Sequence, residues 1–302
     1  MKKISLILLA LLLCVTLLSA CGEKSEFTYE KTDDGIRITG YNGEATELVI
    51  PAELNGRPVT AIGEKAFDSR KFTSVTLPDT ITRIEKYAFL RCYAITSIAI
   101  PDGVTQIERG VFSNCVSLAE IDLPAGLTSI GEDAFSSTAF TSFTVPEGVT
   151  EIGNYAFYTC HGMEKVSLPS TLTTLGDYAF CANAHLTDVT LPEGLTTIGK
   201  YTFSQCNSLK TLTLPSTLTT IDDYAFAGAG LETLTLPSSC KRIGSYAFTE
   251  CDLLTALILP AETDSFGYDV LEGADRVTLY APTDSPAHIW ADENGFKFQP
   301  KD

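Results

Sequence analysis

The sequence has few of the residues on which catalysis and nucleic-acid binding usually depend. Its 302 residues include three histidines, one tryptophan and two methionines, and 38 acidic residues outnumber 21 basic ones. With a formal net charge of −17 and no cluster of lysine and arginine, the chain would repel a phosphate backbone. The composition therefore argues against nucleic-acid binding.

Motifs of the common enzyme classes are missing as well. His161, His185 and His288 stand apart in the sequence, and none belongs to an HExxH pattern. There is no GxSxG elbow and no glycine loop suited to a phosphate. Carboxylate pairs such as Asp33-Asp34 and Asp222-Asp223 lie scattered through the chain, so we interpret them as a solvated acidic edge and leave weak calcium binding open. The sequence predicts no enzyme, no metal and no cofactor.

Long hydrophobic runs are absent except at the N-terminus. Lys2 and Lys3 precede an apolar run from Ile4 to Leu18, which is too short to span a bilayer comfortably. The run ends in Leu-Ser-Ala-Cys at 18–21, and the segment resembles a lipoprotein signal peptide. The resemblance implies a signal peptide at 1–20, a diacylglycerol on Cys21 and a short tether at 21–26. An ordinary secretory signal is the alternative.

A lipid at Cys21 would decide where the protein is found. One acyl chain gives only marginal membrane binding, whereas two or more hold a protein stably. The resemblance therefore implies an exported protein, anchored by lipid to the outer face of the bacterial cell membrane and displayed at the cell surface.

The remainder of the chain repeats itself with a period of 22 or 23 residues from Pro78 onward. Before most repeat prolines, two apolar residues flank one polar residue, as in a half-buried strand, and proline ends the strand because it has no N–H to donate. No unit could bury its apolar face alone, so the units must stack, which predicts a solenoid with one long parallel sheet of about 11 short strands. The repeat prolines are Pro51, Pro78, Pro101, Pro124, Pro146, Pro169, Pro192, Pro215, Pro237 and Pro260, and the repeat phenylalanines are Phe67, Phe89, Phe112, Phe135, Phe157, Phe180, Phe203, Phe226 and Phe248.

The repeat unit, LPxxLTxIGxYAFxxCxxL, resembles the BspA-type leucine-rich repeats of bacterial surface proteins. The resemblance implies a right-handed solenoid with few helices, which includes an N-terminal cap unit and covers 27–281. It also implies a C-terminal cap at 282–302, made of a short helix and a strand. In this cap Ser285-Pro286 can start the helix and Asn294-Gly295 can end it.

The same family is associated with adhesion, so the resemblance implies a non-enzymatic binding module for host or cell-surface proteins or glycans. A structural scaffold of the cell envelope without a dedicated ligand is the alternative. An enzyme with an unrecognised site ranks third.

Five cysteines occupy one repeated position, three residues after the repeat phenylalanine. Units with a loop one residue shorter, after Phe67, Phe135 and Phe226, have no cysteine there. A tight inward turn leaves backbone groups unpaired, and a small side chain with a donor can satisfy one of them, so we expect structural turn residues rather than a metal or disulfide framework. A disulfide between Cys92 and Cys115 on adjacent coils is left open. The turn residues are Cys92, Cys115, Cys160, Asn183, Cys206 and Cys251.

The outward positions of the predicted strands are small and rich in hydroxyl groups. Threonine suits strands, so a purely structural role ranks first, and a smooth face for a protein or glycan partner is the functional alternative. Tyrosines that recur two residues before the repeat phenylalanine are expected to pack on each other, with contact to a ligand as the alternative. The candidate binding face consists of Thr144, Ser167, Thr190, Thr211, Thr213, Thr233 and Thr235.

Overall fold

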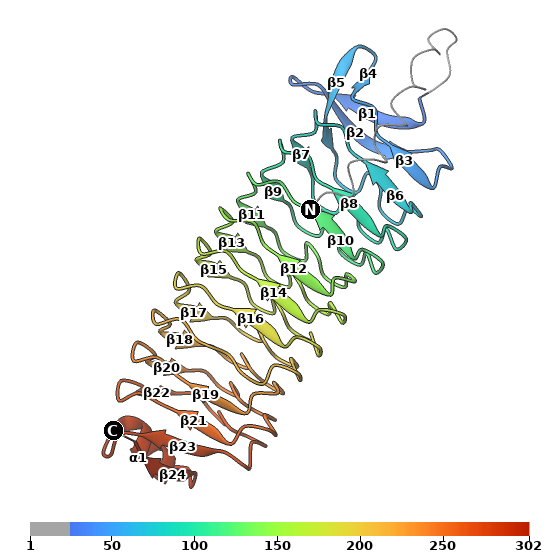
Figure 1. Ribbon diagram of the computed structural model, residues 1–302. Coiled ribbons are helices and arrows are strands. Elements are labelled where there is room, and N and C mark those ends of the chain that lie inside the picture. The colour runs from blue at the N-terminus through green and yellow to red at the C-terminus, as the bar shows by residue number, and fades with distance from the viewer. Residues whose placement is uncertain (1–24, 302) are drawn as a thin grey trace, which may run out of the picture.

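The coils of the chain stack along one axis into an elongated solenoid (Figure 1). The computed structural model describes residues 25–301, so the predicted signal peptide at 1–20 and the lipidation site Cys21 lie outside the described residues. Within 25–301, no helix has the length and apolar character needed to cross a membrane.

One side of the solenoid carries three- or four-residue strands in parallel register. Where strands pair, the buried central residues face each other, as Phe143 faces Val166 and Val166 faces Val189. The predicted parallel solenoid is therefore confirmed. The strands are β3 (Glu47–Val49), β6 (Ser74–Thr76), β8 (Ser97–Ala99), β10 (Glu120–Asp122), β12 (Ser142–Thr144), β14 (Lys165–Ser167), β16 (Asp188–Thr190), β19 (Thr233–Thr235), β21 (Ala256–Ile258) and β23 (Thr278–Ala281).

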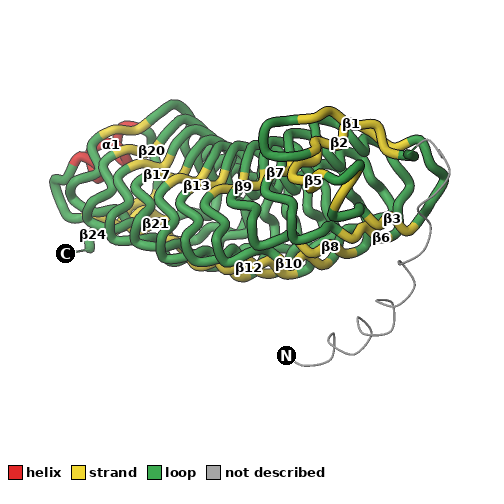
Figure 2. The backbone as a smooth tube through the Cα atoms, turned by 90° about the horizontal axis from the view of Figure 1, so that it is seen from above, coloured by secondary structure: helices red, strands yellow, loops and turns green. Residues whose placement is uncertain are grey.

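A second line of strands, which the sequence did not predict, runs along another side of the solenoid (Figure 2). Each is two residues long and pairs in parallel with strands of adjacent coils, and its second residue is apolar. Two residues are too few to show an alternating pattern, so the second line of strands could not be predicted from the sequence. These strands are β7 (Arg83–Ile84), β9 (Gln106–Ile107), β11 (Ser129–Ile130), β13 (Glu151–Ile152), β15 (Thr174–Leu175), β17 (Thr197–Ile198), β18 (Thr220–Ile221), β20 (Arg242–Ile243) and β22 (Ser265–Phe266).

The segment around each repeat phenylalanine links the coils without forming a strand. The N–H groups of Tyr87, Phe89 and Arg91 donate to carbonyls of the next coil, while the residues between them close turns within their own coil. This alternation of hydrogen bonds between coils and within a coil goes with a left-handed backbone at Tyr87 and Arg91, whose φ values are 62° and 57°. The same two positions, two residues before and two after the repeat phenylalanine, are left-handed in the other coils too.

The core is a column of phenylalanine rings. The nine repeat phenylalanines are fully buried and stack from coil to coil, with ring centroids 5.2 to 5.8 Å apart. Each ring therefore buries its faces against the neighbouring coils, and a single coil would leave them in water. Burial of this kind makes each unit depend on its neighbours.

The N-terminal end of the solenoid is closed by a small sheet. Strand β1 (Phe27–Lys31) pairs antiparallel with β2 (Ile36–Tyr41), and β2 lies parallel to β5 (Arg57–Ile62). Strand β4 (Glu53–Leu54) forms a hairpin with β5, which in turn pairs with β7. The sheet therefore continues directly into the second line of strands.

The C-terminal end is covered by helix α1 (Pro286–Glu293) and strand β24 (Lys297–Pro300). Ser285 caps the helix by accepting a hydrogen bond from the His288 N–H. Strand β24 pairs in parallel with β23, and the Trp290 ring stacks on Phe266 with centroids 4.2 Å apart. These contacts cover the last coil, whose apolar face and strand edge would otherwise meet solvent.

Candidate functional site

The seven residues of the candidate binding face are exposed. They point outward from β12, β14, β16 and β19 and from the coil at 211–214, while the apolar residues between them are buried. Two ion pairs lie along the same strands, Lys165 with Asp188 at 2.5 Å and Lys210 with Glu232 at 3.0 Å. The face is therefore mostly neutral and rich in hydroxyl groups, as the sequence predicted.

The hydrogen-bonded ladder of this face breaks between β6 and β8, between β10 and β12, and on both sides of the coil at 211–214. Residues 211–214 keep the burial alternation of a strand, yet within the described chain they pair with neither β16 nor β19. No backbone hydrogen bond to another backbone group involves Thr211, Leu212, Thr213 or Leu214 among residues 25–301. Among the described residues, this coil is thus unpaired on both sides, whereas the other breaks lie between two strands that each pair on their far side.

A groove opens where the ladder is interrupted. It has a volume of about 370 Å³ and runs between residues 211–214 and residues 233–237. Leu212 and Leu214 are 9% and 8% exposed along it, whereas Leu234 in the neighbouring coil is 1% exposed. Four of the seven candidate residues line the groove, namely Thr211, Thr213, Thr233 and Thr235. This concentration was not visible in the sequence.

The six turn residues lie in the core and contact carbonyl groups of the repeat phenylalanines. The Cys92 thiol donates to the Phe67 carbonyl at 3.1 Å, and the Cys206 thiol donates to the Phe180 carbonyl at 3.3 Å. Cys115, Cys160 and Cys251 make the equivalent contact at 3.1 to 3.2 Å. The side chain at the turn position therefore links one coil to the preceding coil by a hydrogen bond.

Burial keeps these thiols protonated. It raises the pKa of Cys92 and Cys251 to about 12 and that of Cys160 to about 11. A protonated thiol can donate its hydrogen, whereas a thiolate could not. The seven cysteines among the described residues are free thiols, so Cys92 and Cys115 form no disulfide there.

Asn183 occupies the turn position with two donors instead of one. Its amide nitrogen donates to the Phe157 carbonyl at 2.9 Å and to the Phe180 carbonyl at 2.7 Å. In the short loop after Phe135, Thr138 takes over part of this role, because its hydroxyl donates to the Phe135 carbonyl at 2.9 Å. The sequence did not indicate Thr138, which stands three residues after Phe135 in a short loop without the cysteine.

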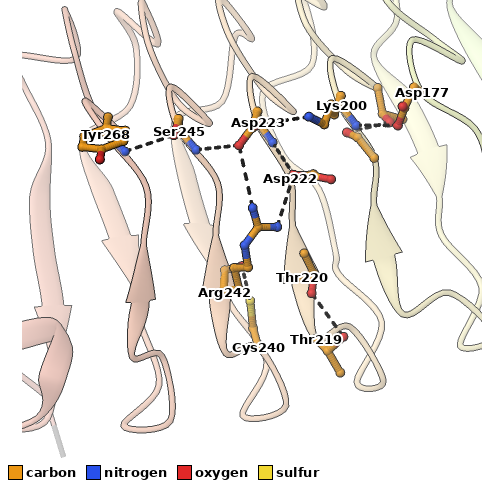
Figure 3. Close-up of polar contacts among 12 residues, drawn as sticks. Asp177, Lys200, Thr219, Thr220, Asp222, Asp223, Cys240, Arg242, Ser245 and Tyr268 are labelled. Carbon is orange, nitrogen blue, oxygen red and sulfur yellow. Dashed lines mark hydrogen bonds and ion pairs between the residues drawn. The ribbon is translucent and has the colours of Figure 1, made fainter.

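The acidic edge has a repeated structural contact. A side-chain oxygen of Asp177 accepts from the Lys200 N–H, Asp223 accepts from the Ser245 N–H, and the Ser245 hydroxyl oxygen accepts from the Tyr268 N–H, at 2.8 to 3.1 Å (Figure 3). Each side chain thus satisfies a backbone donor of the next coil. In the part of the chain that the structure describes, no three potential metal ligands converge.

Five tyrosines form a second aromatic column outside the phenylalanine core. Tyr155, Tyr178, Tyr201, Tyr224 and Tyr246 stack with ring centroids 4.5 to 4.8 Å apart. They therefore pack on each other, as expected from the sequence.

Tyr87, the sixth tyrosine at this repeat position, lies apart from the column. Its ring is flanked by Lys65, whose ammonium is 5.7 Å from the ring centroid, and by the Arg109 guanidinium at 5.8 Å.

With the coil geometry established, the repeats can be compared with known proteins. The model of the BspA type leucine rich repeat region matches residues 60–187 and 180–285, with six copies of the repeat. The chain belongs to the BspA-type leucine-rich repeat family. A search of curated protein sequences gives no match.

Solved structures show the same BspA-type solenoid architecture. A leucine-rich repeat protein from Bacteroides ovatus has a TM-score of 0.73 at 24% identity, over 93% of this chain and 99% of that chain. One from Eubacterium ventriosum has a TM-score of 0.53 at 22% identity, over 92% and 83%. The pneumococcal vaccine antigen PcpA has a TM-score of 0.51 at 17% identity, over 93% and 100%.

Proposed function

We propose that this protein is a non-enzymatic binding and adhesion module of the bacterial cell surface, whose sheet face takes an extended segment of an extracellular protein. The observation that carries the proposal is the coil at 211–214, which pairs with neither of its neighbours. Residues 211–214 leave backbone N–H and C=O groups unpaired beside a groove lined by threonine hydroxyl groups. An extended polypeptide supplies the complementary groups along its whole length.

The character of the face supports a protein partner. Its hydroxyl groups donate and accept hydrogen bonds, and few charges have to be stripped of water when a partner docks. Leu212 and Leu214 add apolar surface at the floor of the groove. BspA-type membership fits a surface role by analogy, and the specific partner follows only from experiment.

Binding to purified extracellular matrix proteins tests this proposal. The described domain, immobilised on a biosensor, is expected to bind at least one of fibronectin, fibrinogen, laminin and collagen saturably. Replacing Thr190, Thr213 and Thr235 together with lysine is expected to weaken that binding at least tenfold, because three ammonium groups would have to be desolvated at the contact.

A charge-matched variant controls for the three added positive charges. Gln106, Thr174 and Thr197 are exposed on the second line of strands, so their replacement with lysine leaves the sheet face unchanged. Equal binding by both triple variants would show that the partner docks elsewhere. Absence of saturable binding to any of the four proteins would favour a structural scaffold.

Lipid attachment at Cys21 is part of the proposal and has its own test. Cys21→Ala removes the thiol that would carry the diacylglycerol, so the variant is expected in the culture medium or the soluble extracellular fraction. The parent protein is expected to label with a palmitate analogue and to sediment with membranes. Membrane attachment of the variant equal to that of the parent would contradict a lipid anchor.

A further inference from the structure

Among the described residues the tyrosine column ends at Tyr155, whose ring stacks on one side only. Tyr178 stacks on this side, with centroids 4.5 Å apart. In the preceding coil, Asp133 occupies the repeat position that carries a tyrosine in the column. Its φ of 56° is the same as that of Tyr201 and Tyr224. The backbone at Asp133 therefore has the conformation found at the tyrosines of the column. Because Asp133 has no ring, the place of the next ring in the column, here called the slot, is unfilled.

A hollow occupies this slot. It has a volume of about 470 Å³ and lies on the coils of Phe112, Phe135 and Phe157, between the carboxylates of Glu132 and Asp133 and the rings of Tyr155 and Tyr158. Small side chains at Ser113 and Ser136 form its floor, since both are buried. The volume falls within the range of small-molecule sites, which is about 300–1,000 Å³.

A second hollow of about 460 Å³ borders the first. The two share Asn114 and Ser137, and the second extends to Thr138 and His161. The loop after Phe135 is one residue shorter than the loops on either side. Polar side chains and tyrosine rings line the first hollow, and the second adds the apolar side chains of Val116 and Ala139. The two hollows together form a groove with room for more than one ring of a ligand.

The aromatic wall of the groove has a defined shape. Tyr155 and Tyr158 stand nearly perpendicular, at 86° with centroids 5.7 Å apart, and form a corner. An aromatic face carries partial negative charge, which attracts the weakly positive C–H groups of a flat, partly apolar ring. The apolar face of a pyranose carries such C–H groups and can stack on the free face of Tyr155.

The polar wall offers hydrogen-bond acceptors and donors. Glu132 is held by Arg109 at 2.9 Å, whereas Asp133 makes no side-chain hydrogen bond or ion pair within residues 25–301. Burial raises the pKa of Asp133, the neighbouring Glu132 carboxylate raises it further, and Arg109 partly opposes both effects. A half-buried carboxylate without a partner gains most from ligand hydroxyl groups that donate to it.

We propose that this groove is a glycan-binding site, in which a pyranose ring stacks on Tyr155 and donates hydroxyl hydrogen bonds to Asp133. Further rings of the same glycan extend past Asn114 and Ser137 toward His161. A simple ammonium ligand suits the groove less well, because the hollow beside Tyr155 alone is much larger than such a cation and only two aromatic rings line it. This site is separate from the sheet face and goes beyond the function proposed above.

A glycan array tests the proposal, with tetramethylammonium chloride as a second probe. The folded domain is expected to bind at least one class among gluco-, galacto-, manno- and N-acetylhexosamine-type chains. Tyr155→Ala is expected to weaken that binding at least tenfold. The matched control is Tyr201→Ala, which removes the same side chain from the middle of the column, where both faces are already stacked; its glycan binding is expected to remain within twofold.

Filling the vacant slot gives an independent test. Asp133→Tyr extends the column at a backbone position that already has the required φ, so the variant is expected to fold with an unchanged or higher melting temperature and to lose glycan binding. Array binding unaffected by both Tyr155→Ala and Asp133→Tyr, or no array binding, would overturn the proposal. Binding of tetramethylammonium without glycan binding would overturn it in favour of an ammonium site.

Failure of this proposal and failure of the proposed function give different results. The triple lysine variant at Thr190, Thr213 and Thr235 alters the sheet face and is expected to keep full glycan binding. Tyr155→Ala is expected to keep binding to the protein partner. Loss of glycan binding in the sheet-face variant would show that one site serves both ligands and would overturn the separate groove site.

Discussion

A donor at the turn after the repeat phenylalanine meets a carbonyl group of the preceding coil. A thiol does this at Cys206, and an amide does it at Asn183 with one more hydrogen bond. The amide also introduces an acceptor, because Oδ1 of Asn183 is buried and has no partner among the described residues. Thiol and amide therefore differ by one gained hydrogen bond and one unsatisfied oxygen, effects of similar size and opposite sign.

Replacing Cys206 tests this balance. Cys206→Asn is expected to change the free energy of unfolding by less than about 1 kcal/mol. Cys206→Leu is expected to destabilise by about 1–3 kcal/mol, because a fully buried turn has no space for two more heavy atoms. Urea unfolding followed by circular dichroism measures both. Equal stability of the leucine and asparagine variants would show that the turn needs no donor.

The turn position illustrates what a sequence can and cannot reveal about single residues. Loop length and the exchange of cysteine with asparagine predicted a small donor in a tight turn. The identity of the acceptor, the Phe carbonyl of the preceding coil, required the stacking geometry. Asp133 was missed for a related reason: an aspartate in an acidic loop has no local pattern, and its significance comes from the tyrosine that would otherwise occupy its slot.

At the scale of elements, the aromatic column is expected to contribute to stability one pair at a time. Tyr201 stacks on Tyr178 and on Tyr224, each with centroids 4.5 Å apart. Tyr201→Ala removes both pairs and is expected to cost about 1–3 kcal/mol, while Tyr201→Phe keeps the rings and is expected to cost much less. Thermal unfolding compares the two variants. Tyr93→Ala, at a ring that is 49% exposed, is the surface control.

The N-terminal cap is joined to the solenoid by a partly buried ion pair. Arg37 in β2 donates two hydrogen bonds to Glu85, both at 2.8 Å, across the boundary between the cap and the first regular coils. Burial alone would raise the pKa of Glu85, but the hydrogen bonds from Arg37 and from the Glu64 N–H outweigh it and lower the pKa below its ordinary value of 4.5. The charged carboxylate is therefore the form that stabilises the folded state.

The pH dependence of the cap follows from the sign of this shift. The stabilisation is fully present above pH 4.5, the ordinary value, and is lost as the pH falls through the lower folded pKa. Glu85→Gln is expected to cost about 1.5–3 kcal/mol at pH 7 and to remove the acid-sensitive step. Hydrogen exchange in β2 and β5 at pH 7 and in acid measures it. Glu30→Gln, at a carboxylate 65% exposed that also contacts Arg37, is expected to cost far less.

Elements also differ in how far the sequence determines them. The first line of strands was predicted from apolar alternation, but residues 211–214 and 233–236 both read Thr-Leu-Thr-Leu, and only the second forms a strand. Local propensity is identical in the two segments, so the interruption arises from how neighbouring coils meet. The groove on the sheet face could not be predicted from the sequence for this reason.

The whole molecule is a one-dimensional stack, which makes its ends the places where unfolding begins. In the described chain each coil contacts the coils beside it, and the two caps cover the terminal faces. In such a stack, a defect at one end is expected to loosen that end first and to weaken with distance along the stack. Trp290, the only tryptophan of the sequence, lies in the C-terminal cap and reports on this end by fluorescence.

Loss of the ring beneath Trp290 tests this behaviour. Phe266→Ala is expected to lower the urea midpoint seen by tryptophan fluorescence more than the midpoint seen by circular dichroism, because the cap separates while distant coils remain stacked. Phe67→Leu perturbs the other end of the phenylalanine column and is expected to shift the dichroism midpoint more than the fluorescence midpoint. If both probes moved together in both variants, the solenoid would unfold as one cooperative unit, and the caps would protect no particular end.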